Sequence, residues 1–237
     1  MVPIFIETKN YLLKYHHMLQ SYTIQFLKEL KNNNNKPWFD ANRKNYEAAK
    51  ADYISLVDAV IAATAKFDEP IGNLKAKDCI FRINRDVRFS KDKSPYKSNM
   101  GASITPGGKK VNAPGYYFHC EPGQSFAAGG LYMPESADLA KIRQEIDYNF
   151  DEWKKIINDK TFKKYFTKGV EGISTLSRPP KGYAEDNPAI EYLKMKSFIV
   201  SRPLNDTDLT DKNLVKEIAK TFEAMKPMID FLNHAMQ

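Results

Sequence analysis

Residues 99–133 read NMGASITPGGKKVNAPGYYFHCEPGQSFAAGGLYM, and this stretch determines the class of fold. Within it, the segments NMGASIT, GYYFHCE and SFAAGGLYM alternate in hydrophobic character with a period of two, which is typical of half-buried strands. The clusters PGGKK, NAP and PGQ that separate them are rich in turn-forming residues. Successive short strands joined by such turns pair with one another, so the stretch predicts an antiparallel meander.

Helical periodicity is found on both sides of the predicted sheet. Before the sheet, a short amphipathic helix begins at Ser21, and a longer helix beginning at Pro37 carries apolar residues at spacings of three and four. After the sheet, apolar residues recur at helical spacing over residues 139–157. A Pro/Gly-rich connection, a short helix, a strand near residues 197–202 and a last helix from about Asp211 complete the pattern.

We therefore predict a single α+β domain over residues 21–237. Its antiparallel sheet is expected to take in about residues 79–133 and the strand near residues 197–202, flanked by N-terminal, middle and C-terminal helices. No repeat or low-complexity linker divides the chain, and 237 residues suffice for one substantial core. Residues 1–20 are interpreted as an N-terminal extension, because the first well-formed helix signal follows Met18.

The composition is that of an ordinary soluble globular protein. Hydrophobic residues make up 42% and charged residues 27% of the chain, and the formal net charge is +7. This charge permits an anionic partner, such as nucleic acid, a phosphorylated metabolite or an anionic membrane, and an ordinary soluble basic surface explains it equally simply. No apolar run approaches the roughly 20 residues of a membrane span, so no membrane partner is expected. The two cysteines, Cys79 and Cys120, provide no disulfide framework, which favours a cytoplasmic location.

The most densely charged stretch is FRINRDVRFSKDKSPYKSN, residues 81–99. Residues 82–97 contain six cations and two anions, a net charge of +4, which is more than half of the net charge of the chain. If residues 81–89 are extended, alternation places Arg85 among apolar side chains, where a guanidinium requires a carboxylate or several carbonyl groups. The residues that follow lack strand alternation and are rich in turn formers, so they are predicted to form a loop.

Two features predict a binding or catalytic site. The lysines and serines of this basic loop suit phosphate or another oxyanion. In GYYFHCE, alternation puts Tyr117, His119 and Glu121 on one face, where the carboxylate can orient the imidazole for proton transfer near neutral pH. If the strand at residues 81–89 lies beside this one, both features line one polar surface. The predicted catalytic residues are His119, Glu121 and Asp86, and the predicted ligand-binding residues are Arg82, Arg85, Arg88, Ser90, Lys93, Tyr96, Lys97 and Tyr117.

Three functions fit these residues, and the sequence leaves open whether the chain is an enzyme. The first is a binding or catalytic domain for a small phosphorylated or carboxylated ligand. The second is a nucleic-acid-binding module, in which cations contact phosphates while Tyr96 and Tyr117 stack on bases. The third is a structural role, in which the charged stretch is an internal ion-pair network with Arg85 paired to Asp92. We rank the first function ahead, because two predicted strands supply polar residues to one face.

The sequence assigns no metal site and no cofactor. It contains no HExxH or CxxC pattern for a metal ion and no GxxxxGK[ST] loop for a nucleoside triphosphate. The segment AAGGLY lies in a predicted strand, so its glycines are interpreted as close strand packing or a bulge.

Four blocks of the sequence resemble one known family: FLKELKNNNNKPWFDANRKNYE, FRINRDVRFSKDKSPYKSNMGA, GYYFHCEPGQSFAAGGLYMP and RPPKGYAEDNPAIEYLKMKSF. In this order they are similar to the bacterial and fungal family called domain of unknown function 2461. The resemblance runs from about Ser21 to the C-terminus. It implies one compact domain and carries over no catalytic residue.

Overall fold

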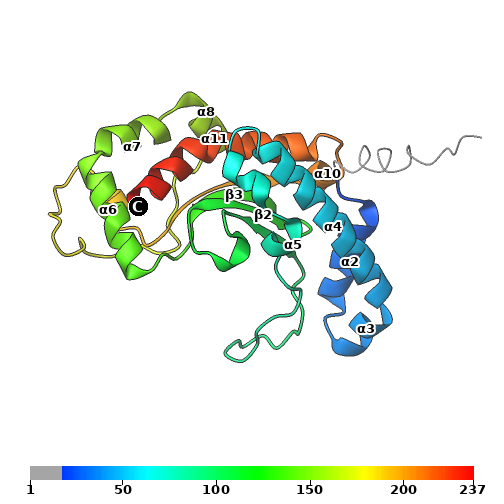
Figure 1. The fold of residues 1–237 in the computed structure, drawn as a ribbon. Coiled ribbons are helices and arrows are strands. Elements are labelled where there is room, and N and C mark those ends of the chain that lie inside the picture. The colour runs from blue at the N-terminus through cyan, green and yellow to red at the C-terminus, as the bar shows by residue number, and fades with distance from the viewer. Residues whose placement is uncertain (1–17) are drawn as a thin grey trace, which may run out of the picture.

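The computed structural model describes residues 18–237, which form a four-stranded antiparallel sheet flanked by helices (Figure 1). The predicted single α+β domain is confirmed. Of the predicted N-terminal extension, residues 1–17 lie outside the described residues. Leu19 is fully buried, and its backbone nitrogen donates a hydrogen bond to the carbonyl oxygen of Leu209 at 2.9 Å. Contacts with the core therefore begin no later than residue 19, so residues 19 and 20 belong to the folded domain and not to an extension.

The N-terminal part of the fold is helical. Pro37 lies in the first turn of a helix, as predicted, and the side chain of Asn35 caps that helix by accepting a hydrogen bond from the Trp38 nitrogen at 3.0 Å. The long helix predicted from Pro37 is interrupted at Asn42, whose backbone leaves helical geometry at φ −104° and ψ 19°. The elements are α2 (Ser21–Asn32), α3 (Lys36–Ala41), α4 (Arg43–Thr64), η1 (Glu69–Asn73) and α5 (Ala76–Cys79).

The sheet has the simplest antiparallel order, β1-β2-β3-β4. The meander predicted from residues 99–133 is confirmed, and so is the strand predicted near residues 197–202. The register pairs Gly101 with His119 and His119 with Phe126, so these three residues form one row across the sheet. The elements are β1 (Met100–Ile104), η2 (Gly108–Lys110), β2 (Gly115–Cys120), β3 (Ser125–Leu131) and β4 (Phe198–Leu204).

One face of the sheet forms the core. It packs against α4 and α11 (Leu214–Ala235), which lie together on the same side of the sheet (Figure 1). Tyr53 of α4 donates a hydrogen bond from Oη to the carbonyl oxygen of Phe118 at 3.0 Å, and the ring of Tyr116 stacks on Phe222 of α11 with centroids 4.8 Å apart. Tyr116, Phe118 and Cys120 are buried and face the core, so Tyr117, His119 and Glu121 lie on the opposite side, as the predicted alternation requires.

The glycine pair of AAGGLY serves close packing and does not form a bulge, because β3 pairs one residue to one residue with β2 and β4 through both glycines. A β-carbon at Gly129 would lie 2.2 Å from Met225 Sδ of α11, so this position permits close packing of helix on strand. Gly130 has φ of 125°, a conformation that side chains with a β-carbon rarely adopt. The two glycines therefore set the distance between sheet and helix and the path of β3.

The helices within residues 136–165 pack against α11. The apolar stripe at residues 139–157 is divided at Asn149 into two helices, and Trp153 is fully buried between the rings of Phe198 and Phe231. Among residues 18–237, no helix combines the length and the apolar character that crossing a membrane requires. The elements are α6 (Ser136–Tyr148), α7 (Phe150–Ile157), α8 (Lys160–Tyr165), α9 (Ile190–Leu193) and α10 (Asp206–Leu209).

Short backbone bridges cover part of each edge of the sheet. Beside β1, the nitrogen of Phe81 donates a hydrogen bond to the carbonyl oxygen of Gly101 at 2.9 Å. Beside β4, Glu171 and Ile199 exchange two backbone hydrogen bonds of 2.7 and 3.0 Å. Neither edge strand is therefore bare along its whole length.

Candidate functional site

The sheet face opposite α4 and α11, here called the open face, borders a cavity of about 980 Å³. Its floor is formed by the side chains that alternate with the core residues of the strands, because successive residues of a strand point to opposite faces. Residues 80–99, here called the arm, project from this side of the molecule (Figure 1). Floor residues include Gly101, Tyr117, His119, Phe126, Ala128 and Ser201, and rim residues include Phe81, Arg85, Asp86, Lys97, Lys110 and Tyr132.

A chain of hydrogen bonds joins Tyr117 and His119 of β2 to Glu121, which directly follows the strand. Tyr117 Oη lies 3.2 Å from His119 Nδ1, and His119 Nε2 lies 3.1 Å from Glu121 Oε2. A carboxylate only accepts hydrogen bonds, so Nε2 carries the proton in the neutral imidazole, and Nδ1 then accepts from the tyrosine hydroxyl. The predicted pairing of His119 with Glu121 is confirmed, and Tyr117 extends it.

The surroundings of this chain fix its geometry. The imidazole of His119 stacks on the ring of Phe126, with centroids 4.7 Å apart and an interplanar angle of 12°. Glu121 Oε1 accepts a hydrogen bond from Ser98 Oγ at 3.4 Å and lies 3.9 Å from Lys31 Nζ. The side chains of His119 and Glu121 are only 14% and 15% exposed. The imidazole is thus hydrogen-bonded at both ring nitrogens and stacked on one ring face.

Gly101 provides the space that the Tyr117 hydroxyl occupies. A β-carbon at Gly101 would lie 2.3 Å from Tyr117 Oη. Burial raises the pKa of Tyr117 to about 12, so its hydroxyl is protonated at neutral pH and serves as a donor. The small residue on β1 and the large one on β2 therefore act together to bring the hydroxyl to the imidazole.

Replacing Gly101 with alanine is expected to separate Tyr117 from His119 while the chain stays folded. The new methyl group must displace the hydroxyl, whereas the backbone of Gly101 is not in a conformation reserved for glycine. The ¹⁵N chemical shift of His119 Nδ1 in NMR spectra reports the loss of the hydrogen bond. Gly169→Ala is the control: a β-carbon there meets nothing within 4 Å, and its φ of 71° makes the substitution strained, so the variant shows whether a loss of stability alone moves the Nδ1 shift. An unchanged Nδ1 shift in Gly101→Ala would contradict the expectation.

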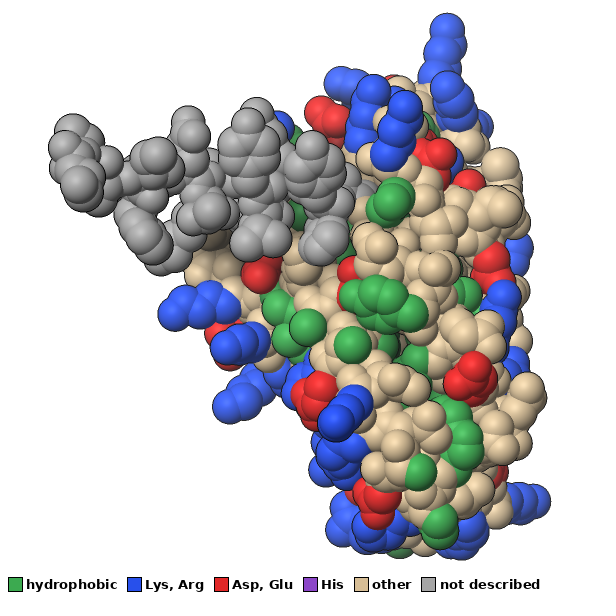
Figure 2. Space-filling view, turned by 90° about the vertical axis from the view of Figure 1, so that its right-hand side faces the viewer, with side chains coloured by type: hydrophobic (Ala, Val, Ile, Leu, Met, Phe, Trp, Pro, Cys, Tyr) green, Lys and Arg blue, Asp and Glu red, His purple; other side chains and the backbone are tan. Residues whose placement is uncertain are grey.

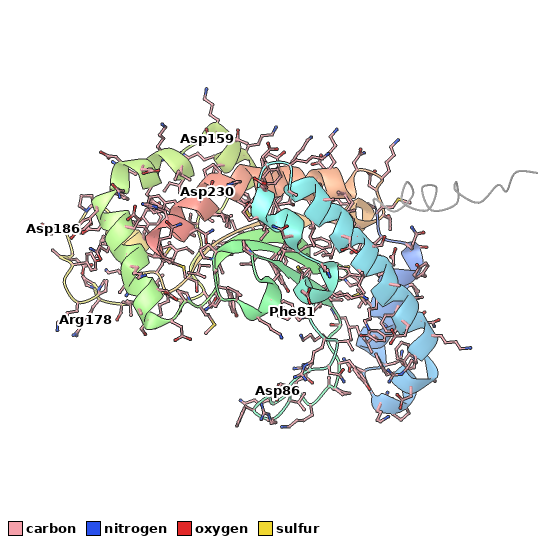
Figure 3. All side chains as sticks on the ribbon, viewed as in Figure 1. Phe81, Asp86, Asp159, Arg178, Asp186 and Asp230 are labelled. Carbon is pink, nitrogen blue, oxygen red and sulfur yellow. The ribbon has the colours of Figure 1, made fainter. Side chains whose placement is uncertain are left out.

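The arm is a loose ribbon and not a strand of the sheet. It is held by isolated bridges, Ile80 with Ala102 and Asn84 with Tyr96, and its two sides are joined by backbone hydrogen bonds such as Lys97 N to Ile83 O at 2.8 Å. The regular alternation considered for residues 81–89 does not extend along it. Figure 3 shows Phe81 where the arm leaves the sheet and Asp86 far out along the arm.

Arg85 organises the outer part of the arm. Its guanidinium pairs with the carboxylate of Asp92, donates a hydrogen bond to the Ser94 carbonyl oxygen at 3.2 Å, and lies 3.4 Å from Ser90 Oγ. Hydrogen bonds from Ser94 and then from Arg85 lower the pKa of Asp92 to about 2. The expected carboxylate partner of Arg85 is therefore present, although the side chain of Asp92 is 60% exposed at the surface of the arm.

The other predicted contacts on the outer arm also have partners within it. Arg88 forms an ion pair with Asp86 at 2.7 Å, and Lys93 Nζ donates a hydrogen bond to the carbonyl oxygen of Val87 at 3.0 Å. The pKa of Asp86 is lowered by the hydrogen bond from Arg88. Asp86 and Arg85 still line the cavity, whereas Arg88, Ser90 and Lys93 are not among its lining residues.

Lys97, at the base of the arm, differs from these cations. Its ammonium lies 5.5 Å from the centroid of the Phe81 ring, and it has no carboxylate within salt-bridge distance among residues 18–237. Partial burial and, second, the positive charge of Arg82 lower its pKa. Lys97 lines the cavity, so it presents a positive charge without a carboxylate partner to the same cavity that His119 and Tyr117 line.

Two further predicted ligand contacts, Arg82 and Tyr96, lie away from this cavity. Arg82 lines a smaller cavity of about 440 Å³ together with Tyr53 and Lys50. Tyr96 is 7% exposed and stacks on Phe39, with ring centroids 3.9 Å apart. The structure thus brings Tyr117, His119, Asp86, Arg85 and Lys97 to one cavity, with Glu121 bonded to His119 behind it.

A family model described as "Conserved hypothetical protein (DUF2461)" matches residues 22–231. The chain belongs to this family. The match covers nearly all of the described residues, in agreement with the resemblance of the four sequence blocks. Neither the search of curated proteins nor the search of solved structures returned a match. The chemistry of this DUF2461 chain therefore has to be argued from its own residues.

Several site residues of the DUF2461 chain are absent from the sequence prediction. Phe126 shares a face of its strand with Ala128, so alternation in SFAAGGLYM was sufficient to find it. Ser103 follows from the same rule in NMGASIT. Lys110 lies in a turn cluster and Tyr132 follows the end of a strand, so neither carries a periodic signal. Their places in the cavity depend on tertiary structure.

The described part of this DUF2461 chain contains neither a cluster of metal-binding side chains nor an exposed cysteine thiol. Among residues 18–237, no group of three or more histidine, cysteine, aspartate or glutamate side chains is arranged to hold a metal ion. Cys79 and Cys120 are free and buried. Burial raises the pKa of Cys79 to about 11 and that of Cys120 further, so both are thiols at neutral pH.

Proposed function

We propose that the open face of the sheet binds a small phosphorylated or carboxylated molecule. Lys97 contacts the anionic group, and Tyr117, His119 and Glu121 hold or move a proton at the same ligand. The observation that carries the proposal is the placement of an unpaired, partly buried ammonium on the cavity that also contains the Tyr117–His119 hydrogen bond. A desolvated cation without a carboxylate gains more from an anionic ligand than a solvated surface lysine does.

The hydrogen-bond chain gives the site a path for a proton between the ligand and His119. When Tyr117 Oη passes its proton to Nδ1 and takes one from an acidic ligand atom, the hydroxyl is restored and the imidazole becomes an imidazolium, which Glu121 stabilises through Nε2 at 3.1 Å. In the reverse step the imidazolium returns its Nδ1 proton to Tyr117 while Oη protonates a basic ligand atom. Both steps place Tyr117 in contact with the ligand and Glu121 as the positioning residue. Measured turnover of a bound ligand separates an enzyme from a binding protein.

Lys97→Gln is expected to weaken the binding of such an anion by about tenfold or more, because a charge-assisted hydrogen bond contributes about 1.5–3 kcal/mol. The measurement is a thermal-shift screen of inorganic phosphate, sugar phosphates, nucleotides and carboxylates, followed by isothermal titration of each hit. Lys93→Gln is the matched control, since Lys93 belongs to the same arm and its ammonium is bonded to a carbonyl oxygen. Equal affinities in wild type and Lys97→Gln would refute the role of Lys97.

The other two functions predict different results in the same screen. Figure 2 shows one face of the molecule, on which lysine and arginine side chains project in several separate groups. Nucleic-acid binding stays a prediction, and short oligonucleotides at two salt concentrations test it, because such binding weakens steeply with salt. The ion pairs of Arg85 and Arg88 support a structural role for part of the charge. That role and an anion site at Lys97 are compatible.

We also propose that the protein is located in the cytoplasm. The two cysteines are free thiols, which supports a reducing compartment. Fractionation of cells that express the chain tests this location directly.

A further inference from the structure

The smaller cavity of about 440 Å³ adjoins the one on the open face. It is lined by residues of α4, α5 and η2 and by the base of the arm. Phe81, Asn99 and Lys109 line both cavities, so the two meet where the arm leaves the sheet (Figure 3). A ligand on the open face therefore has a neighbouring space into which it can extend.

This second cavity is lined by cations and, within residues 18–237, by no carboxylate. The cations are Lys50, Lys77, Arg82 and Lys109. Among the described residues, only Lys50 of these four has a carboxylate within salt-bridge distance, that of Glu47 at 3.6 Å. Cations gathered in this way repel one another, and a bound anion replaces that repulsion with attraction.

Backbone contacts position Lys109 at the junction of the two cavities. Its Nζ donates hydrogen bonds to the carbonyl oxygens of Lys77 and Asp78, at 3.0 and 3.3 Å. An ammonium group has three donors, so one remains for a ligand. The charge of Lys109 is therefore held in place before a ligand binds.

Arg82 and Lys97 lie on facing sides of the arm. The Lys97 nitrogen is hydrogen-bonded to the carbonyl oxygen of Ile83, and the next such bond toward the sheet joins Phe81 to Gly101. Between these two bonds one side of the arm has a single residue, Arg82, and the other has three, and such an unequal count re-aims side chains. Lys97 lines the first cavity and Arg82 the second. The base of the arm thus supplies one cation to each of two adjoining cavities.

We propose, on the basis of the anion site proposed above, that the ligand is a small molecule with two phosphate or carboxylate groups at opposite ends. One group contacts Lys97 on the open face. The other lies in the second cavity, where the planar guanidinium of Arg82 can bond two of its oxygens and Lys77 and Lys109 add charge. The spacer between the groups passes Phe81, which is 41% exposed.

The test is isothermal titration of the full chain with bisphosphonates whose two groups are joined by one, three or six carbons. Methylphosphonate, propylphosphonate and hexylphosphonate are the counterparts with a single anionic group. Two joined groups bind together only when the spacer matches the distance between their sites. The three-carbon or six-carbon bisphosphonate is therefore expected to bind about tenfold or more tightly than its counterpart, and also more tightly than the one-carbon compound.

A pair of arginine variants locates the second group. Arg82→Gln is expected to abolish the gain of the bisphosphonate, while the affinities for the alkylphosphonates stay within about twofold of wild type. Arg178→Gln is the matched control, because it removes the same charge from an exposed arginine well away from Phe81 (Figure 3). It is expected to leave every affinity within about twofold. Circular dichroism and melting temperatures establish that both variants are folded.

The outcomes separate this inference from the proposed function. Bisphosphonates that bind no more tightly than their counterparts, or whose gain survives in Arg82→Gln, overturn the second contact. The anion site itself still stands if Lys97→Gln weakens the binding of the alkylphosphonates. Alkylphosphonates that lose affinity in Arg82→Gln and not in Lys97→Gln overturn both proposals, since the anion then lies in the second cavity alone.

A single-stranded oligonucleotide is titrated beside the series, because it also carries phosphates that could occupy both cavities. If it binds more tightly than every bisphosphonate and loses affinity in Arg82→Gln, the small ligand is overturned in favour of nucleic acid. Weaker binding of the oligonucleotide than of the best bisphosphonate supports the small ligand.

Discussion

Gly130→Ala is expected to lower the free energy of unfolding by about 2–6 kcal/mol, since strained backbone and forced overpacking each cost roughly 1–3 kcal/mol. Gly130 has φ of 125°, and a β-carbon there would lie 1.9 Å from the carbonyl oxygen of Phe198. That oxygen belongs to the backbone of β4, so it cannot move aside as a flexible side chain does. Urea unfolding followed by circular dichroism measures the loss.

Gly123→Ala is the matched control for this prediction. Gly123 also has a positive φ, 78°, but a β-carbon there meets nothing within 4 Å. Its substitution is therefore expected to cost only the left-handed backbone conformation, about 1–2 kcal/mol. Similar losses in the two variants would show that Gly130 is required for its backbone angle and not for the approach of β4.

Tyr96→Ala is expected to destabilise the fold by about 3–5 kcal/mol, the usual cost of removing a large buried aromatic side chain. Tyr96 is 7% exposed and stacks on Phe39 of α3, and its backbone nitrogen and oxygen are both bonded to the side chain of Asn34. These contacts attach the arm to the N-terminal helices. Hydrogen exchange of the Lys97 amide, which is bonded to Ile83 O, is expected to accelerate together with the loss of stability.

Phe89→Ala serves as the control on the same arm. The side chain of Phe89 is 96% exposed, so its removal is expected to change the free energy of unfolding by less than about 0.5 kcal/mol. If Tyr96→Ala lowered stability no more than Phe89→Ala, then the stacking on Phe39 would not be what attaches the arm.

The sheet was predictable from sequence because its signals are local. In GYYFHCE each residue alternates between the core and the open face, and turn clusters mark where the strands end. The helix interruptions at Asn42 and Asn149 were not predictable from periodicity, since the apolar stripes continue across them. Only the backbone geometry of the two asparagines shows that the stripes bend around the core.

The candidate site was predictable only where its residues share one strand. Tyr117, His119 and Glu121 are two residues apart, so regular alternation sufficed to bring them together. The arm lacks a continuous hydrogen-bond ladder, and alternation therefore failed to place its cations. Arg85 and Lys97 line the cavity, whereas Arg82 lines another and Tyr96 enters the core. Which cation lacks a carboxylate is a property of tertiary structure.

The bridge between the arm and β1 has a consequence for association between chains. An unpaired edge strand is a template for pairing with a second molecule, and β1 is one of the two edges of this sheet. The hydrogen bond from Phe81 to Gly101 occupies part of that edge, and the Glu171–Ile199 bridge occupies the opposite one. An arm that detaches therefore exposes backbone donors and acceptors of β1. A substitution that loosens the arm is expected both to lower the stability of the fold and to promote aggregation through this edge.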